Sequence, residues 1–114
     1  MPYIGTKTTL KISDEKKEII KRRFGKAIEV FPGKSERWLM VGFDENLTMY
    51  MAGDGSEDIA FVEIKILGKG SKESFDKMTA ETCKILSEEL GIRGDRIYVK
   101  YEECEHWGYD SVNF

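Results

Sequence analysis

Apolar residues divide the chain into a strand–helix–strand unit that occurs twice. Residues 3–10 are rich in β-branched side chains and predict a strand. After it, apolar residues recur at helical spacing and mark one buried face: Ile19, Ile20, Phe24, Ala27, Ile28 and Phe31. Ser13 or Asp14 caps this helix and residues 31–33 (FPG) end it. Residues 37–43 (RWLMVGF) predict the second strand.

The second half repeats this order at similar spacing. Residues 59–67 (IAFVEIKIL) predict a strand, and residues 96–101 (RIYVKY) predict the last one. Between them Ser71 begins a helix and Gly91 ends it. The apolar stripe of this helix consists of Phe75, Met78, Cys83, Ile85, Leu86 and Leu90. We therefore expect two strand–helix–strand units, each with a right-handed crossover.

Two such units predict an α+β fold (an α/β sandwich), with a four-stranded sheet and both helices on one face. Residues 48–51 (TMYM) predict a short extra strand between the halves. The later strands carry apolar residues in both alternating sets, for example Phe61 in one and Val62 in the other. A sheet with one wet face alternates more cleanly. Since the chain offers no third long helix, we expect a homo-oligomer whose sheets face inward.

Length and composition favour one domain, residues 1–114, that binds neither nucleic acid nor membrane. Of the 114 residues, 40% are apolar and 34% are charged, enough for a modest core. The 18 basic and 21 acidic residues leave a net charge of −3, whereas duplex-binding proteins carry a basic excess. No apolar run approaches the ~18 residues of a membrane span. The amino terminus lacks the signal-peptide pattern, so we expect a cytoplasmic protein.

Most familiar site chemistries lack the residues that they need. His106 is the only histidine, which disfavours imidazole metal sites and Ser–His triads. Residues 102–106 (EECEH) suggest a metal cluster, but exposed charge near the chain end is the better interpretation. Residues 33–35 (GKS) and 68–70 (GKG) imitate phosphate loops without the required glycines, so both predict turns. We expect no metal.

Pro2 supports two interpretations. Proline has no backbone N–H, but it is tolerated where a strand starts or lies at an edge. Alternatively, aminopeptidases remove an initiator methionine that precedes proline, which would make the Pro2 nitrogen a free secondary amine. A free α-amino group has a pKa of about 8, and an apolar site or a nearby cation lowers it. Such an amine would be an effective general base near neutral pH.

Several stretches together carry a family resemblance. They are MPYI at 1–4, PGKSERWLMV at 32–41, LGKGS at 67–71, GIRGDRIYVKY at 91–101 and WGYDSVNF at 107–114. In this order and spacing, the chain resembles the macrophage migration inhibitory factor family of the tautomerase superfamily over essentially its whole length. The resemblance implies a homotrimer, with three sheets wrapped into a barrel, helices outside, and active sites at the subunit interfaces. It also implies a cofactor-independent keto–enol tautomerase that acts on an enolisable, phenylpyruvate-like α-keto acid, with Pro2 as general base after Met1 is removed.

Other site residues follow from the same resemblance. Lys34 matches the active-site lysine of the family, which would bind the substrate carboxylate or the developing enolate and lower the pKa of the amine. The matching or adjacent substrate-binding positions are Tyr3, Trp38, Ile66, Leu67, Tyr98, Trp107, Tyr109 and Phe114. Tyr98 would reach the site of a neighbouring subunit. Simpler interpretations are a solvated lysine at position 34 and ordinary core or half-buried strand positions for most of the others.

The chain also departs from the family. Lys100 stands where a well-known member has an amide side chain. If Lys100 points into the substrate-binding site, it adds a second cation, and we predict a lower proline pKa and a preference for more anionic substrates. Residues 59–62 (IAFV) lack the CxxC of some members, so no thiol oxidoreductase activity is expected. Two other functions stay open: a non-catalytic, cytokine-like interaction protein, and a trimer that binds a small acid without turnover. Secretion without a signal peptide also stays open.

Overall fold

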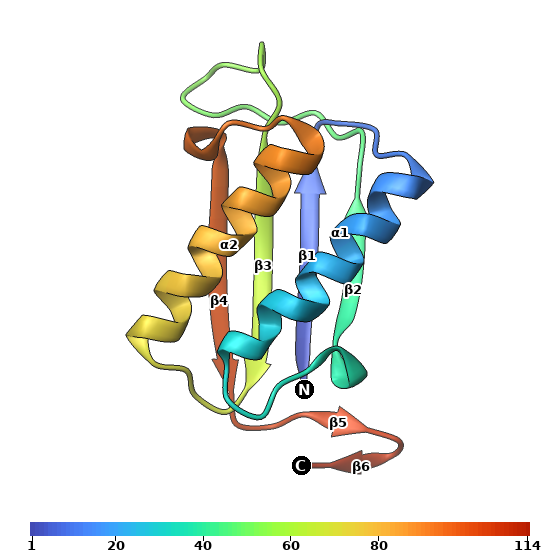
Figure 1. The fold of residues 1–114 in the computed structure, drawn as a ribbon, viewed down its shortest axis with the longest axis vertical. Coiled ribbons are helices and arrows are strands. Elements are labelled where there is room, and N and C mark those ends of the chain that lie inside the picture. Colours follow the sequence, from blue (N-terminus) through green and yellow to red (C-terminus); the bar gives the residue numbers. More distant parts are fainter.

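The computed structural model describes residues 1–114 and shows a four-stranded sheet with both long helices on one face (Figure 1). The strands of the sheet are β1 (Pro2–Thr8), β2 (Met40–Asp44), β3 (Ala60–Leu67) and β4 (Ile97–Cys104), and the helices are α1 (Asp14–Ala27) and α2 (Lys72–Leu90). Short 3₁₀ helices are η1 (Ile28–Val30), η2 (Glu36–Trp38) and η3 (Gly94–Arg96), and the tail forms a hairpin of β5 (Gly108–Tyr109) and β6 (Val112–Asn113). The predicted α+β sandwich is confirmed.

The sheet has the strand order β2-β1-β3-β4. β1 and β2 are parallel, as are β3 and β4, and β1 lies antiparallel to β3 in the centre. Each parallel pair is joined through one helix, as parallel neighbours require a crossover. The duplicated strand–helix–strand unit is therefore confirmed. The β5–β6 hairpin lies beyond the end of the sheet where the chain begins (Figure 1).

Both long helices begin where the capping residues predict. The Ser13 side chain accepts a hydrogen bond from the backbone N–H of Lys16 at 3.1 Å, and Ser71 accepts one from Ser74 at 3.1 Å. These bonds satisfy N–H groups that a helix start leaves without a partner. α2 ends at Gly91, whose φ of +69° suits glycine.

The start of one strand and the whole of a short extra strand were predicted wrongly from the sequence. Residues 36–38 form a 3₁₀ turn held by i→i+3 hydrogen bonds, so the strand predicted over 37–43 begins only at Met40. Residues 48–51 form no strand, because they lie in the loop beyond the end of the sheet, where no strand edge is available for pairing (Figure 1). There Met51 and Asp54 close a turn through two backbone hydrogen bonds of 3.1 and 2.9 Å.

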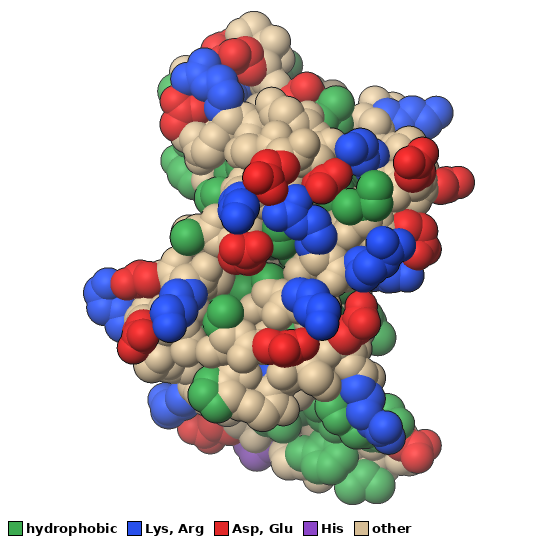
Figure 2. Space-filling model, in the orientation of Figure 1, with side chains coloured by type: hydrophobic (Ala, Val, Ile, Leu, Met, Phe, Trp, Pro, Cys, Tyr) green, Lys and Arg blue, Asp and Glu red, His purple; other side chains and the backbone are tan.

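The core lies between the helices and the sheet. Its largest fully buried side chains are Phe24, Phe31, Ile4, Ile20, Ile28, Ile64, Ile66, Met78, Ile85, Leu86, Ile92 and Val62. Basic and acidic side chains are interspersed over the outer surface of the helices (Figure 2). Neither helix is long and apolar enough to cross a membrane.

The opposite face of the sheet is covered by no other element of the chain. Strand register places two kinds of side chain there. The apolar and aromatic ones are Tyr3, Met40, Phe61, Leu67, Tyr98 and Cys104, and the charged ones are Lys7, Asp44, Glu63, Lys65, Lys100 and Glu102. This open face is thus more polar than the alternation of Phe61 and Val62 suggested. Met40 and Tyr98 are 68% and 59% exposed.

Candidate active site

The start of β1 meets the end of β3. Because the two strands are antiparallel, Pro2 lies opposite Ile66, and the backbone N–H of Leu67 donates to the carbonyl of Met1 at 3.1 Å. Pro2 is buried. Ile66 is fully buried in the core beneath the helices, so its side chain lines no open surface. The pairing places the amino terminus beside a segment more than 60 residues away in the sequence.

Lys34 reaches the same place from the connection between α1 and β2. Gly33, with a φ of +80°, turns the chain, and the backbone N–H of Lys34 donates to the carbonyl of Phe31 at 3.0 Å. Phe31 is 1% exposed and packs edge-on against Phe75, which anchors this turn in the core. The Lys34 ammonium donates to the carbonyl of Leu67 at 3.0 Å. The backbone N–H of Leu67 therefore binds Met1, and the backbone carbonyl of Leu67 binds Lys34.

This environment favours a neutral amine at the amino terminus. Partial burial lowers the pKa of the Met1 amino group, and the positive charge and hydrogen bonding of Lys34 lower it further. Cys104 acts weakly in the opposite direction. Removal of Met1 would move the amine to Pro2, one residue further into the sheet. An amine held here has the electrostatics of a general base.

An aromatic cluster lies at the end of the molecule where the chain begins (Figure 1). Trp38 in η2 packs edge-on against Tyr109 in β5, with ring centroids 5.4 Å apart, and Tyr109 stacks on Phe114 at 6.3 Å. The backbone N–H of Phe114 donates to the carbonyl of Trp107 at 2.8 Å. The three rings are 40%, 50% and 54% exposed, so they present a surface on which a flat ligand can lie. Figure 2 shows apolar side chains gathered at this end.

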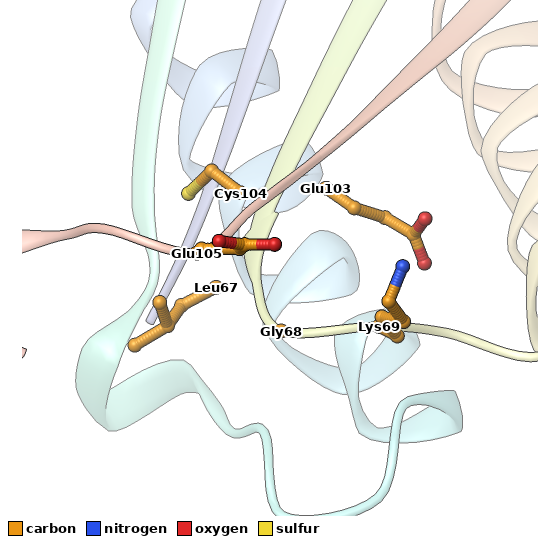
Figure 3. Close-up of a pocket in the computed structure, with 6 residues that line it drawn as sticks. All are labelled: Leu67, Gly68, Lys69, Glu103, Cys104 and Glu105. Atoms are coloured by element: carbon orange, nitrogen blue, oxygen red, sulfur yellow. The ribbon is translucent and has the colours of Figure 1, made fainter.

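A hollow of about 340 Å³ opens beside Leu67, between the ends of β3 and β4. Its walls are Leu67, Gly68, Lys69, Glu103, Cys104 and Glu105 (Figure 3). Cys104 lies opposite Leu67 in the parallel ladder and was missed as a site residue in the sequence. Pairing β3 with β4 from Ala60 and Ile97 onward would have found it, since the register then brings positions 67 and 104 together.

Three predicted site residues lie elsewhere within one chain. Tyr98 pairs with Phe61, which precedes Leu67 by six residues along β3. Six residues of a strand place Tyr98 about 20 Å from Leu67. Lys100 lies on the open face, with its ammonium 3.4 Å from a carboxylate oxygen of Glu102.

Tyr3 also points along the open face. Its ring crosses Gly5, where an added Cβ would lie 2.9 Å from the ring, and its hydroxyl reaches Gly42. Glycine at both positions makes room for the ring. None of these three side chains meets the Pro2 end of its own chain, whereas Lys34, Leu67 and Pro2 come together there.

Comparison with known proteins identifies the family of the chain. The family model described as macrophage migration inhibitory factor (MIF) matches residues 1–111. The chain belongs to the macrophage migration inhibitory factor family. This confirms the resemblance seen in the sequence and places the chain in the tautomerase superfamily. A comparison with curated protein sequences gave no significant match.

Solved structures share the fold over 90% or more of the chain. Leishmania major MIF2 is 25% identical with a TM-score of 0.93, covering 100% of this chain and 97% of that one. The MIF-like protein of Entamoeba histolytica is 25% identical with a TM-score of 0.86, covering 99% and 98%. A protein named Pt0534, solved after inactivation by 2-oxo-3-pentynoate, is 20% identical with a TM-score of 0.79, covering 90% and 85%, and shows the fold alone.

Proposed function

We propose that this MIF-family chain is a cofactor-independent keto–enol tautomerase, an isomerase that acts on an enolisable α-keto acid of the phenylpyruvate type. Pro2 is the general base once Met1 has been removed. The observation that carries the proposal is the meeting of the amino terminus, the Lys34 ammonium and the end of β3 at one end of the sheet. The aromatic cluster of Trp38, Tyr109 and Phe114 would bind the ring of the substrate.

The reaction needs only a proton to move. The lone pair of the Pro2 nitrogen takes a proton from the carbon next to the keto group, and the C–H electrons form the C=C bond as the carbonyl oxygen becomes an enolate. Return of the proton to that oxygen gives the enol and restores the amine. The Lys34 ammonium exchanges the Leu67 carbonyl for the substrate carboxylate or the enolate oxygen, which stabilises the charge that develops.

The experiment that tests catalysis starts with the intact mass of the protein. A mass lacking one methionine means that Pro2 carries a free amine. Phenylpyruvate enolisation is then expected to fall at least about 100-fold in Pro2→Gly, and by a similar factor in Lys34→Ala. Lys26→Ala, which removes an exposed lysine of α1, is the matched control and should keep the parent rate. Unchanged activity in the first two variants would show that the proposed roles are wrong.

An acetylenic α-keto acid gives a readout independent of turnover. With 2-oxo-3-pentynoate, the amine of Pro2 would add to the alkyne carbon remote from the ketone, forming an N–C bond, while the carbon next to the ketone takes up a proton. Peptide mass analysis should place the adduct on Pro2. A chain that retains Met1 is the control, because its Pro2 nitrogen is an amide and should stay unlabelled. An adduct on Cys104 alone would contradict the assignment of Pro2 as the nucleophilic amine.

The proposal includes a cytoplasmic homotrimer with its sheets facing inward. The uncovered face of the sheet, with Met40 and Tyr98 exposed, supports an assembly. Within one chain, Tyr98 and Lys100 lie away from the Pro2 end of the sheet. In the trimer, the same two residues of a neighbouring chain would complete the site. Sedimentation velocity should give a trimer, and a stable monomer would remove the interface site from the proposal.

A further inference from the structure

Arg37 stands at the rim of the aromatic cluster without an acidic partner. Its guanidinium carbon lies 5.1 Å from the centroid of the Trp38 ring, and Trp38 packs on Tyr109. Arg23 and Arg93 each bind carboxylates at 2.6–2.9 Å, whereas Arg37 forms no ion pair. The guanidinium is thus held over the ring by a cation–π contact and keeps its charge uncompensated.

The neighbouring carboxylate points away from this rim. Glu36 packs against α1 at Gly25, where an added Cβ would lie 2.7 Å from the Glu36 carboxyl carbon. The missing side chain at Gly25 therefore provides the space in which this carboxylate lies. Although Glu36 and Arg37 are adjacent in the sequence, they diverge, and the carboxylate leaves the guanidinium facing the aromatic cluster alone.

Two cations three residues apart on one short connection therefore make different contacts. Lys34 binds the Leu67 carbonyl beside the amino terminus, where the keto acid reacts in the proposed function. Arg37, three residues later, is exposed and lies over the ring of Trp38. Stacking occupies the face of a guanidinium and leaves its N–H edge free, which matches a carboxylate in a bidentate manner.

We infer that Arg37 determines substrate specificity by binding a second anionic group at the far end of a flat α-keto acid. The site then takes an elongated dianion, with the keto acid at Pro2 and Lys34, an aromatic or flat middle part on Trp38 and Tyr109, and a distal carboxylate at Arg37. This inference rests on the proposed function for the orientation of the keto acid.

Lys100 is the competing origin of such a preference. Within its own chain, Lys100 lies 3.4 Å from Glu102 and is opposite Glu63 in the ladder. The Glu102 carboxylate offsets its charge, whereas no carboxylate is paired with Arg37. The structure therefore favours Arg37, and a Lys100→Asn variant separates the two.

A pair of substrates that differ by one carboxylate tests the inference. The ratio of kcat/KM for para-carboxyphenylpyruvate to that for phenylpyruvate is measured in the Met1-free protein. In Arg37→Gln we expect this ratio to fall about fivefold, mainly through KM, the size expected of an exposed bidentate ion pair. Arg37→Lys keeps the positive charge but cannot bind a carboxylate through two parallel N–H groups. In this variant the ratio of kcat/KM values should fall about half as far on a logarithmic scale. Arg22→Gln removes another exposed, unpaired arginine, on α1, and should leave the ratio unchanged.

Binding of acids that cannot enolise separates this inference from the proposed catalysis. Calorimetry gives the Kd values of cinnamate and 4-carboxycinnamate, which differ by one distal carboxylate. The ratio of these Kd values measures the preference for the second carboxylate in binding alone. If phenylpyruvate is not enolised but the binding preference still falls in Arg37→Gln, catalysis is refuted and the inference stands. If Arg37→Gln changes neither ratio, the inference is overturned even with full turnover. A loss of preference in Lys100→Asn but not in Arg37→Gln also overturns it.

Discussion

Replacing Lys34 by glutamine should move the pH dependence of the reaction toward higher pH. Glutamine keeps an N–H donor in place of the lysine ammonium, which now binds the Leu67 carbonyl at 3.0 Å, but it carries no charge. The pKa of the amino terminus is lowered by burial first and by Lys34 second. The substitution therefore removes the second cause and leaves the first.

The direction of the shift follows from the loss of one charge next to a partly buried amine. Lys34⁺ disfavours the protonated amine, so its removal raises the amine pKa. Less of the Pro2 base is then free at a given pH, and the acidic limb of the profile moves up.

The assay is kcat/KM for phenylpyruvate as a function of pH, because this parameter reports the free enzyme. We expect the acidic midpoint of Lys34→Gln to lie above that of the parent, besides a lower plateau from the lost substrate contact. Lys26→Gln removes an equal charge from the exposed side of α1 and should leave the midpoint in place. A midpoint in Lys34→Gln equal to or below the parent's would refute the electrostatic argument.

The other predictions concern stability. Ser71→Ala removes the hydrogen bond to Ser74 at the start of α2 and should cost about 1 kcal/mol, lowering Tm by about 5 °C. Ser35→Ala is its control, since the Ser35 side chain makes no capping bond, and an equal loss in both would contradict the cap. The hydrogen bond from Lys17 holds the pKa of Glu45 below its usual range, so the native state gains stability above the unfolded pKa of about 4.3 and loses it as pH falls. Glu45→Gln should thus have a lower Tm than the parent at pH 7 by scanning calorimetry, and a gap that persists at pH 3 would argue against this linkage.

Local sequence signals predicted the elements that depend on near neighbours. Ser13 and Ser71 begin helices because their hydroxyl groups accept N–H groups three residues away, a contact that any chain with this local order can form. Apolar residues at helical spacing predicted the buried faces. By contrast, the stretch from 37 to 43, apolar after Arg37, has no local feature that separates a strand from the 3₁₀ turn of residues 36–38.

The candidate site also contains residues that the sequence identifies and residues that only the structure reveals. Pro2 and Lys34 are identifiable in the sequence because the family pattern covers them, and the structure places both beside Leu67. The sequence did not reveal Cys104 as their neighbour, nor the contrast between Arg37 and Glu36. Both features depend on the path of the backbone in three dimensions, through the β3–β4 register and the space left at Gly25.

The residue order alone therefore determined the duplicated strand–helix–strand units, the helix starts and the presence of a proline that can become an amine. The tertiary structure decided what surrounds that amine. The antiparallel pairing of β1 with β3 and the turn at Gly33 join segments that are 33 to 66 residues apart, and electrostatic forces act across those short distances in space. A pKa is lowered by the groups that lie nearby after folding, and no local pattern records them.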